Sequence, residues 1–164
     1  MRQSMTRRAS LRMAAAGAAL ALTPALARAQ ATHEIQMLNV HPENKRLRQV
    51  FYPRIQVIQP GDTVTFVAVD KAHTSASIDG MIPDGADGWN GKINEDVSAT
   101  LTTPGFYGYQ CTPHATVGMV GLVVVEGDGM LDNLDAAMSV RQRGKAKASW
   151  DEIWEEVSGM GLTG

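Results

Sequence analysis

Short segments with strand-like patterns occupy the middle of the chain. Residues 33–39 alternate polar and apolar side chains, which is the period of a half-buried strand. Alternating or β-branched runs between turn residues predict further strands over residues 54–58, 63–69, 97–101, 106–111 and 117–125. Several short strands at regular spacing favour an all-β fold, a Greek-key β-sandwich.

Two connections between these segments have distinct compositions. Thr103-Pro104-Gly105 is typical of a tight turn between neighbouring strands. Residues 79–96 are rich in Gly, Pro, Asp and Asn, and we expect them to form a long surface loop.

The pattern becomes helical after Gly129. Apolar residues recur at i, i+3, i+4 and i+7 in Trp150, Ile153, Trp154 and Val157. Ser149 to Glu152 fits a capping box, and Gly159 stands where a C-cap glycine belongs. A shorter helix is predicted over residues 130–138. Two Trp on one helix face need a surface to cover, so we expect a two-helix tail, residues 128–164, packed on a sandwich of residues 30–127.

The first 29 residues have the order of a secretory signal peptide. A basic segment precedes an Ala-rich apolar run and the small-residue pattern Ala27-Arg28-Ala29. The apolar run has roughly ten residues, fewer than the ~20 of a membrane-spanning helix. Arg7-Arg8 resembles a twin-arginine export signal. We therefore expect export to the periplasm, cleavage near Ala29 and no stable membrane association.

Removal of this leader changes the charge of the chain. It takes five of the 15 basic residues and none of the 17 acidic ones, which leaves ten against 17 and a formal charge of −7. Such a chain is a poor nucleic-acid ligand, since phosphate neutralisation needs a basic face. The 135 remaining residues suit a single domain, which we expect to be monomeric.

The chemistry is concentrated around the single cysteine. Cys111-Thr112-Pro113-His114 is followed by Gly118-Met119, a Cys-x2-His-x4-Met spacing between two predicted strands. Cys111 has no partner in its own chain for a disulfide. His73 follows the strand predicted over residues 63–69, and in a sandwich the two loops can meet at one end.

This set of side chains indicates a particular metal. Two His and one Cys with a weak axial Met are the ligands of an electron-transfer copper site. Structural zinc sites prefer four Cys or His ligands and do not use a thioether. Taken singly, Met119 is typical of a strand core, His73 of a surface or hydrogen-bonded histidine, and Cys111 of an inert buried thiol. Their combination favours the metal site.

The remaining histidines are interpreted as solvent-facing. His33 lies at the start of the processed chain and His41 precedes a proline in a predicted loop. Met37 and Met81 are predicted to lie in the core.

Several motifs together resemble the pseudoazurins, small periplasmic blue copper proteins of the cupredoxin family. The matching segments are Gly61 to Phe66, Val69 to His73, Ser77 to Ala86, Lys92 to Glu95 and Cys111 to Met119. Amicyanins are similar in Cys-Thr-Pro-His, but their Met comes one residue sooner. Plastocyanins share the spacing and lack a two-helix tail, so the tail and Met81-Ile82-Pro83 favour the pseudoazurins.

The resemblance implies a cupredoxin-like sandwich and one type 1 copper per chain, with His73, Cys111, His114 and Met119 as the ligands. It also implies that the amide of Thr74, where Asn is frequent in the family, donates to the cysteine sulfur. Pro113 has no N–H and cannot donate there. Of the lysine ring that surrounds the exposed histidine in the family, Lys71 and Lys92 remain, whereas Gln110 and residues 88–90 are uncharged.

The expected function is one-electron transfer without enzymatic activity. Redox partners, a reductase or a c-type cytochrome, are expected to make transient contacts around His114. The family's habits imply a copper nitrite reductase as the acceptor. Two alternatives remain open on the sequence alone: a copper storage or delivery module that uses the same ligands, and a metal-free adhesion or interaction sandwich.

Overall fold

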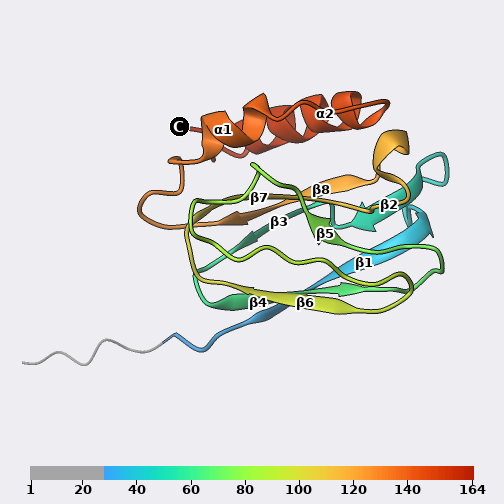
Figure 1. Ribbon diagram of the computed structural model, residues 1–164, viewed down its shortest axis with the longest axis horizontal. Helices are drawn as coiled ribbons and strands as arrows, with labels where there is room; N and C mark the ends of the chain where they lie inside the picture. The colour runs from blue at the N-terminus through green and yellow to red at the C-terminus, as the bar shows by residue number, and fades with distance from the viewer. Residues whose placement is uncertain (1–27) are drawn as a thin grey trace, which may run out of the picture.

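The computed structural model describes residues 28–164, so all but the last two positions of the predicted signal peptide lie outside the described residues. Within this range, two four-stranded sheets face each other and two helices cover one of them (Figure 1). The strands are β1 (Thr32–Val40), β2 (Arg48–Tyr52), β3 (Ile55–Ile58), β4 (Asp62–Val67), β5 (Ala76–Ser77), β6 (Val97–Leu101), β7 (Gly105–Gln110) and β8 (Val120–Val125). The all-β sandwich with a helical tail is confirmed.

Strand directions give the sandwich two distinct ends. In the sheet β2-β1-β4-β6, β1 and β4 are parallel, so the loops that follow them emerge at the same end. In the sheet β3-β8-β7-β5, the antiparallel pair β7 and β8 places residues 111–119 at this end as well. We call it the histidine end; its loops are residues 41–47, 68–75, 91–96 and 111–119. The opposite end, the aspartate end, comprises residues 59–62, 102–104 and 126–133.

The predicted strands are all present, with two additions. β2 and β5 were not expected; β5 has only two residues, too few to give a periodic pattern, and β2 begins with the polar residues Arg48 and Gln49. The Thr103-Pro104-Gly105 prediction was wrong in one respect, because β6 and β7 belong to different sheets and the turn crosses between them. The loop over residues 79–96 is also not confined to the surface, since Met81 and Trp89 are buried.

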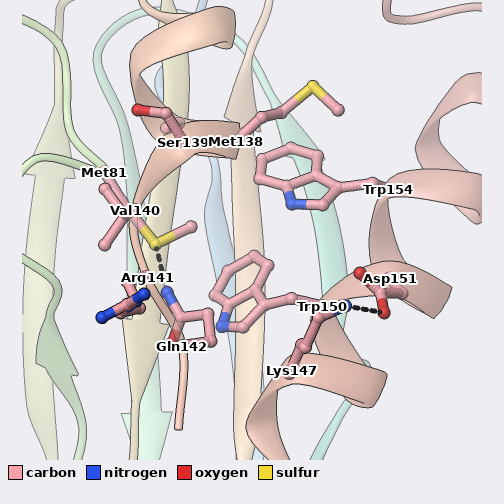
Figure 2. A pocket seen from close by; sticks show the side chains of 11 residues that line it. Met81, Met138, Ser139, Val140, Arg141, Gln142, Lys147, Trp150, Asp151 and Trp154 are labelled. Atoms are coloured by element: carbon pink, nitrogen blue, oxygen red, sulfur yellow. Dashed lines mark hydrogen bonds and ion pairs between the residues drawn. The ribbon is translucent and has the colours of Figure 1, made fainter.

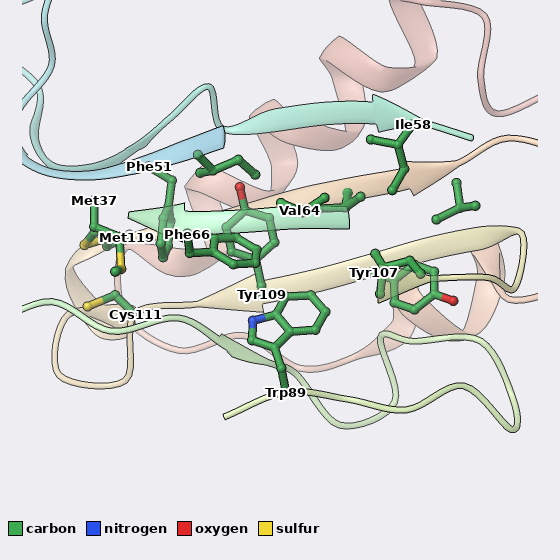
Figure 3. Packing of buried hydrophobic residues seen from close by; sticks show 14 residues of the cluster. Met37, Phe51, Ile58, Val64, Phe66, Trp89, Tyr107, Tyr109, Cys111 and Met119 are labelled. Carbon is green, nitrogen blue, oxygen red and sulfur yellow. The ribbon is translucent and has the colours of Figure 1, made fainter. Parts of the chain in front are cut away.

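An aromatic cluster fills the space between the sheets (Figure 3). The Phe51 and Tyr109 rings meet edge to face at 4.7 Å, and Phe66 stacks on Trp89 at 5.2 Å. Met37 belongs to the same cluster, as expected of a core residue. Such rings pack through edge-to-face and offset contacts as well as through buried area. An aromatic core therefore supports the loops of the histidine end.

The C-terminal helices build a second core against the outer face of the β3-β8-β7-β5 sheet. They are α1 (Leu134–Ser139) and α2 (Ala146–Gly159). α2 buries Trp150, Ile153 and Val157 beside residues of β7 and β8. Figure 2 shows Trp150 and Trp154 on α2 facing the segment that ends α1. The Trp150 N–H finds no acceptor within residues 28–164, so packing alone holds this ring.

The predicted helix limits need correction. α2 begins one turn before Ser149, which lies inside the helix and provides no capping hydrogen bond. It ends after Gly159, and the left-handed glycine is Gly161, with φ 75°. The capping-box pattern was misleading because Ala146 is already buried against the sheet, and tertiary packing starts the helix there. α1 is also shorter than the predicted 130–138. In the described part of the chain, no helix is long and apolar enough to cross a membrane.

Candidate metal centre

Three of the four predicted ligands converge at the histidine end. The Nδ1 atoms of His73 and His114 are 3.2 Å apart. The Cys111 Sγ atom lies 3.8 Å from His73 Nδ1 and 3.4 Å from His114 Nδ1. His73 and Cys111 are completely buried, whereas His114 is partly exposed. Two loops that are distant in sequence thus bring three potential donor atoms into one small space.

Backbone hydrogen bonds hold the loop between β7 and β8 in a compact form. The His114 N–H donates to the Cys111 carbonyl at 3.0 Å, and the Met119 N–H donates to the His114 carbonyl at 3.2 Å. The Cys111 N–H closes the loop on the Met119 carbonyl at 3.0 Å. Met119 itself is 1% exposed and lies at the Cys111 end of the aromatic cluster (Figure 3). The fourth predicted ligand is therefore anchored to the same loop.

The helical tail presses on this loop from outside. Gly118 has φ 101°, a conformation that side chains rarely adopt, and a Cβ atom there would lie 2.7 Å from Ser149 Oγ on α2. The Lys145 N–H donates to the Thr116 carbonyl at 2.9 Å. Glycine at position 118 therefore allows both the turn and the close approach of α2.

Asn39 orients His73. The His73 Nε2 atom is 3.0 Å from Asn39 Oδ1, an acceptor, so Nε2 carries the proton and the lone pair of Nδ1 faces Cys111 and His114. Burial lowers the pKa of His73, and the neighbouring His114 lowers it further. Both effects favour the neutral ring, which is the form that binds metals. The sequence analysis did not identify Asn39, although its position at the end of the first predicted strand was a possible signal.

The environment of the Cys111 sulfur has opposing effects on the pKa of its thiol. Burial raises the pKa of the thiol, while the backbone N–H groups of Thr74 and His114 lower it. The donation from the Thr74 amide to the sulfur that the resemblance implied agrees with this direction and stays a prediction. A cation in this position would favour the thiolate and release the proton, as metal binding to cysteine generally does.

The donor set suits copper. The three donor atoms all lie within 4.8 Å of one another. Imidazole nitrogens support Cu(II), thiolate and thioether sulfurs favour Cu(I), and two His with one Cys is the near-trigonal set of electron-transfer copper sites. Burial excludes water from two of the three donors. The residues present therefore fit a copper ion that exchanges one electron.

The other two histidines are not in this cluster, and each faces solvent only in part. His33 is partly buried, with its Nε2 atom 3.0 Å from Asp62 at the aspartate end. His41 is also partly buried, and its Nδ1 atom accepts the N–H groups of Glu43 and Asn44. Each has a local hydrogen-bond partner that periodicity alone does not reveal.

Known proteins with similar sequences and folds are copper proteins. Residues 36–126 match the family described as copper binding proteins, plastocyanin/azurin family. A pseudoazurin from Paracoccus pantotrophus is 43% identical over 146 residues, which cover 88% of this chain and 95% of that protein. A pseudoazurin from Methylorubrum extorquens is 36% identical over 145 residues, with the same two coverages.

Solved structures agree with the sequence relatives. A pseudoazurin structure from Sinorhizobium superimposes with a TM-score of 0.72 and 42% identity, covering 78% of this chain and 97% of that one. The pseudoazurin of Methylobacterium extorquens AM1 gives a TM-score of 0.70 and 36% identity, covering 77% and 98%. With its sandwich fold, its buried His and Cys donors and these relatives, the chain belongs to the pseudoazurins, blue copper electron carriers of the plastocyanin/azurin family.

Proposed function

We propose that one copper ion per chain is held by His73 Nδ1, Cys111 Sγ, His114 Nδ1 and Met119 Sδ, and that the chain carries single electrons in the periplasm to a reductase. The observation that carries this proposal is the convergence of two imidazole nitrogens and a thiol sulfur in a largely buried cluster. Copper bound there supplies the change between Cu(II) and Cu(I).

The protein's part in this function is to keep the donor atoms still. Asn39 fixes the His73 ring, and three backbone hydrogen bonds fix the loop from Cys111 to Met119. Ligands that move little when the metal changes charge make electron transfer fast, and hydrogen bonds to the sulfur tune the potential. Burial of His73 and Cys111 keeps water from adding a ligand.

His114 is the proposed route for the electron, because it is the partly exposed member of the cluster. Large apolar side chains are exposed on all four loops of the histidine end: Leu47, Val69, Ile93 and Val117, which are 48%, 52%, 55% and 48% exposed. Apolar side chains at the rim let a partner approach closely and leave again, as small redox interfaces do.

The charged side chains are distributed unevenly between the two ends of the sandwich, which would orient a redox partner. Eight of the ten Lys and Arg residues after residue 29 lie on or beside the loops of the histidine end: Lys45, Arg46, Arg48, Lys71, Lys92, Arg141, Arg143 and Lys145. The same loops contain four acidic residues: Glu43, Asp70, Glu95 and Asp96. The segments of the aspartate end contain Asp62, Glu126, Asp128 and Asp132 and no Lys or Arg. The chain after residue 29 is acidic overall, whereas basic side chains outnumber acidic ones on and beside the loops of the histidine end, which supports an acidic docking surface on the partner.

The sequence suggested that few basic residues surround His114, because three of the basic residues that lie there come late in the chain. Arg141, Arg143 and Lys145 come after the sandwich, yet the Lys145 N–H bonds the Thr116 carbonyl and Arg143 lines a hollow with Ala115 and Thr116. The segment before α2 thus adds basic side chains beside the ligand loop. We propose a copper nitrite reductase as the acceptor, with a c-type cytochrome as the other class of redox partner.

The test is a visible spectrum of the oxidised, copper-loaded protein, with Cys111→Ala as its variant. An intense absorption in the wild type that is absent from the variant supports the cysteine–copper bond. Its persistence in Cys111→Ala contradicts the ligand assignment. A copper storage or delivery module would instead release copper readily to a chelator and fail to reduce a copper nitrite reductase in stopped-flow mixing. The burial of two ligands argues against ready release.

A further inference from the structure

Asn94 contacts the backbone on both sides of His73. Its side-chain Oδ1 accepts the N–H of Ala72 at 2.6 Å, and its own N–H donates to the His73 carbonyl at 2.9 Å. A single residue of the loop before β6 therefore brackets the residue that we propose as the first copper ligand.

Neighbouring hydrogen bonds extend this bracket along the two loops. The Thr74 hydroxyl donates to the Gly91 carbonyl at 2.7 Å, and the Gly91 N–H donates to the Ser75 carbonyl at 2.8 Å. A Cβ atom on Gly91 would lie 3.0 Å from the Ser75 carbonyl and 2.8 Å from Val97, so the two loops are in close contact. Residues 72–75 are joined to residues 91–94 at four points.

The backbone conformations at the bracket are unusual. Ala72 has φ 73° and Asn94 has φ 64°. Asn adopts this left-handed conformation readily, whereas for Ala it is unfavourable because of its Cβ atom. An Ala persists there only where surrounding contacts hold it. The Asn94 side chain provides such a contact, since it binds the N–H of Ala72 directly.

From this geometry we infer that Asn94 is a positioning residue for His73, an inference that rests on the copper site proposed above. Asn39 fixes the ring of His73 through Nε2, and Asn94 fixes its backbone through the two flanking peptide groups. Together they leave Nδ1 in one place when the charge of the metal changes. Asn94 is exposed and touches no proposed ligand atom, so its effect is exerted through the loop.

Three variants separate the hydrogen bond from the strain. Asn94→Gly removes the acceptor but suits φ 64°, and Asn94→Asp retains an acceptor at the same place. Ala72→Gly relieves the left-handed Ala while leaving the Asn94 side chain intact. Ile93→Val, at an exposed neighbouring position, is the matched control.

Amide hydrogen exchange of the metal-free protein and copper affinity are the two measurements. In Asn94→Gly, the Ala72 amide exchanges about tenfold faster, as expected for the loss of one hydrogen bond. Copper affinity falls about tenfold, the usual effect of removing a group that orients a metal ligand. The hyperfine splitting of the Cu(II) EPR signal also changes. Asn94→Asp, Ala72→Gly and Ile93→Val stay close to the wild type in all three.

Three results would overturn the inference, and a fourth would overturn the proposed copper site. Faster exchange throughout β8, at Val123 and Val124 as well, would mean that Asn94→Gly merely destabilises the whole sandwich. Equal losses in Ala72→Gly and Asn94→Gly would assign the positioning to the Ala72 conformation instead. If the wild type shows no intense absorption with copper, the proposed copper site itself fails. If it does and Asn94→Gly matches it in all three measurements, the positioning role alone fails.

Discussion

The two ends of the sandwich treat buried polar groups in opposite ways. At the aspartate end, Asp62 is completely buried and its carboxylate is saturated by the protein. It accepts the N–H groups of Ala31 at 2.9 Å and Gln59 at 3.1 Å and lies 3.0 Å from His33 Nε2. Before processing it also pairs with the Arg28 guanidinium at 2.7 Å, a partner that the predicted cleavage near Ala29 removes. This end satisfies its charge within its own chain.

At the histidine end, the buried donor atoms face one another. The Nδ1 atoms of His73 and His114 approach to 3.2 Å, and Cys111 Sγ completes the group. Two imidazole nitrogens and a sulfur that converge in this way form a donor set that a cation between them can satisfy. This contrast distinguishes a structural polar cluster from a ligand-binding one. In a structural cluster the protein supplies all the hydrogen-bond partners, whereas a binding cluster is stabilised when its ligand is present.

Copper addition gives the largest expected effect of this contrast. At a free copper concentration a thousandfold above Kd, binding stabilises the folded state by about 4 kcal/mol, a rise of roughly 10–15 °C in the unfolding midpoint for a domain of this size. Cys111→Ser, which keeps the shape and loses the thiolate, should lose most of this rise. Differential scanning calorimetry with and without copper measures both. An equal rise in both proteins would mean that the copper binds elsewhere.

Asp62→Asn is the corresponding change at the other end. The substitution replaces a carboxylate oxygen with an NH2 group that faces donors, so we expect the unfolding midpoint to fall by roughly 5–10 °C. The visible spectrum should not change, because the aspartate end lies across the sandwich from the copper site. A spectral change without a loss of stability would contradict the division between the ends.

Acid should act on the same carboxylate. In the full chain the Arg28 guanidinium, the Ala31 amide and His33 hold the pKa of Asp62 below the 3.8 of an unperturbed aspartate, and after the predicted cleavage near Ala29 the Ala31 amide, His33 and the Gln59 amide remain to lower it. A lowered pKa in the folded state adds stability that is complete above the unfolded value and is lost as the pH falls below about 4. Denaturant unfolding of the metal-free protein between pH 6 and pH 3 should show this loss, and Asp62→Asn should reduce it. An unchanged pH dependence in Asp62→Asn would assign the acid sensitivity to other carboxyl groups.

The sequence predicted the interior of the fold better than its edges. Alternating or β-branched runs bounded by turn residues located six strands: burial alternates along β4, whereas β7 and β8 are buried on both faces and were found by their apolar, turn-bounded sequences. β5 escaped detection because Ala76 and Ser77 become a strand only through pairing with β7. The Ser149 capping pattern failed for a related reason, since contacts with the sheet begin α2 at Ala146. Local signals describe a segment reliably where tertiary contacts agree with them.

The candidate site was likewise predictable only in part. Cys-x2-His-x4-Met is a local signal, and His73 was identifiable because it follows a strand. Asn39 and Asn94 could not be identified in this way, because neither belongs to a motif. Asn39 is 34 residues from His73, and Asn94 is 22 residues from Ala72. The basic segment from Arg141 to Lys147 belongs to this group as well, since only the fold brings it beside Thr116. The proposed ligands follow from spacing along the sequence, but the residues that orient and surround them depend on the fold.

Met119→Leu tests the weakest of the proposed ligands. Loss of the thioether removes electron donation that stabilises Cu(II), so the reduction potential should rise, by roughly tens of millivolts. The intense absorption should remain, because it depends on the Cys111 sulfur. Voltammetry and a visible spectrum measure the two quantities. A fall in the potential would contradict the axial role of Met119, and Met37→Leu, in the neighbouring core, is the control.

The smallest expected effect concerns docking. Arg143→Gln with Lys145→Gln removes two of the basic side chains beside the ligand loop, and electrostatic steering weakens as charge is removed. We expect the rate of electron transfer to a copper nitrite reductase to fall by about twofold to threefold at low salt, and less at high salt where the Debye length is short. Asp128→Asn at the aspartate end should leave the rate nearly unchanged, although it alters the net charge. A rise in the rate with Asp128→Asn about half as large, on a logarithmic scale, as the fall with the double variant would mean that net charge governs the encounter, and the basic histidine end would then have no directing role.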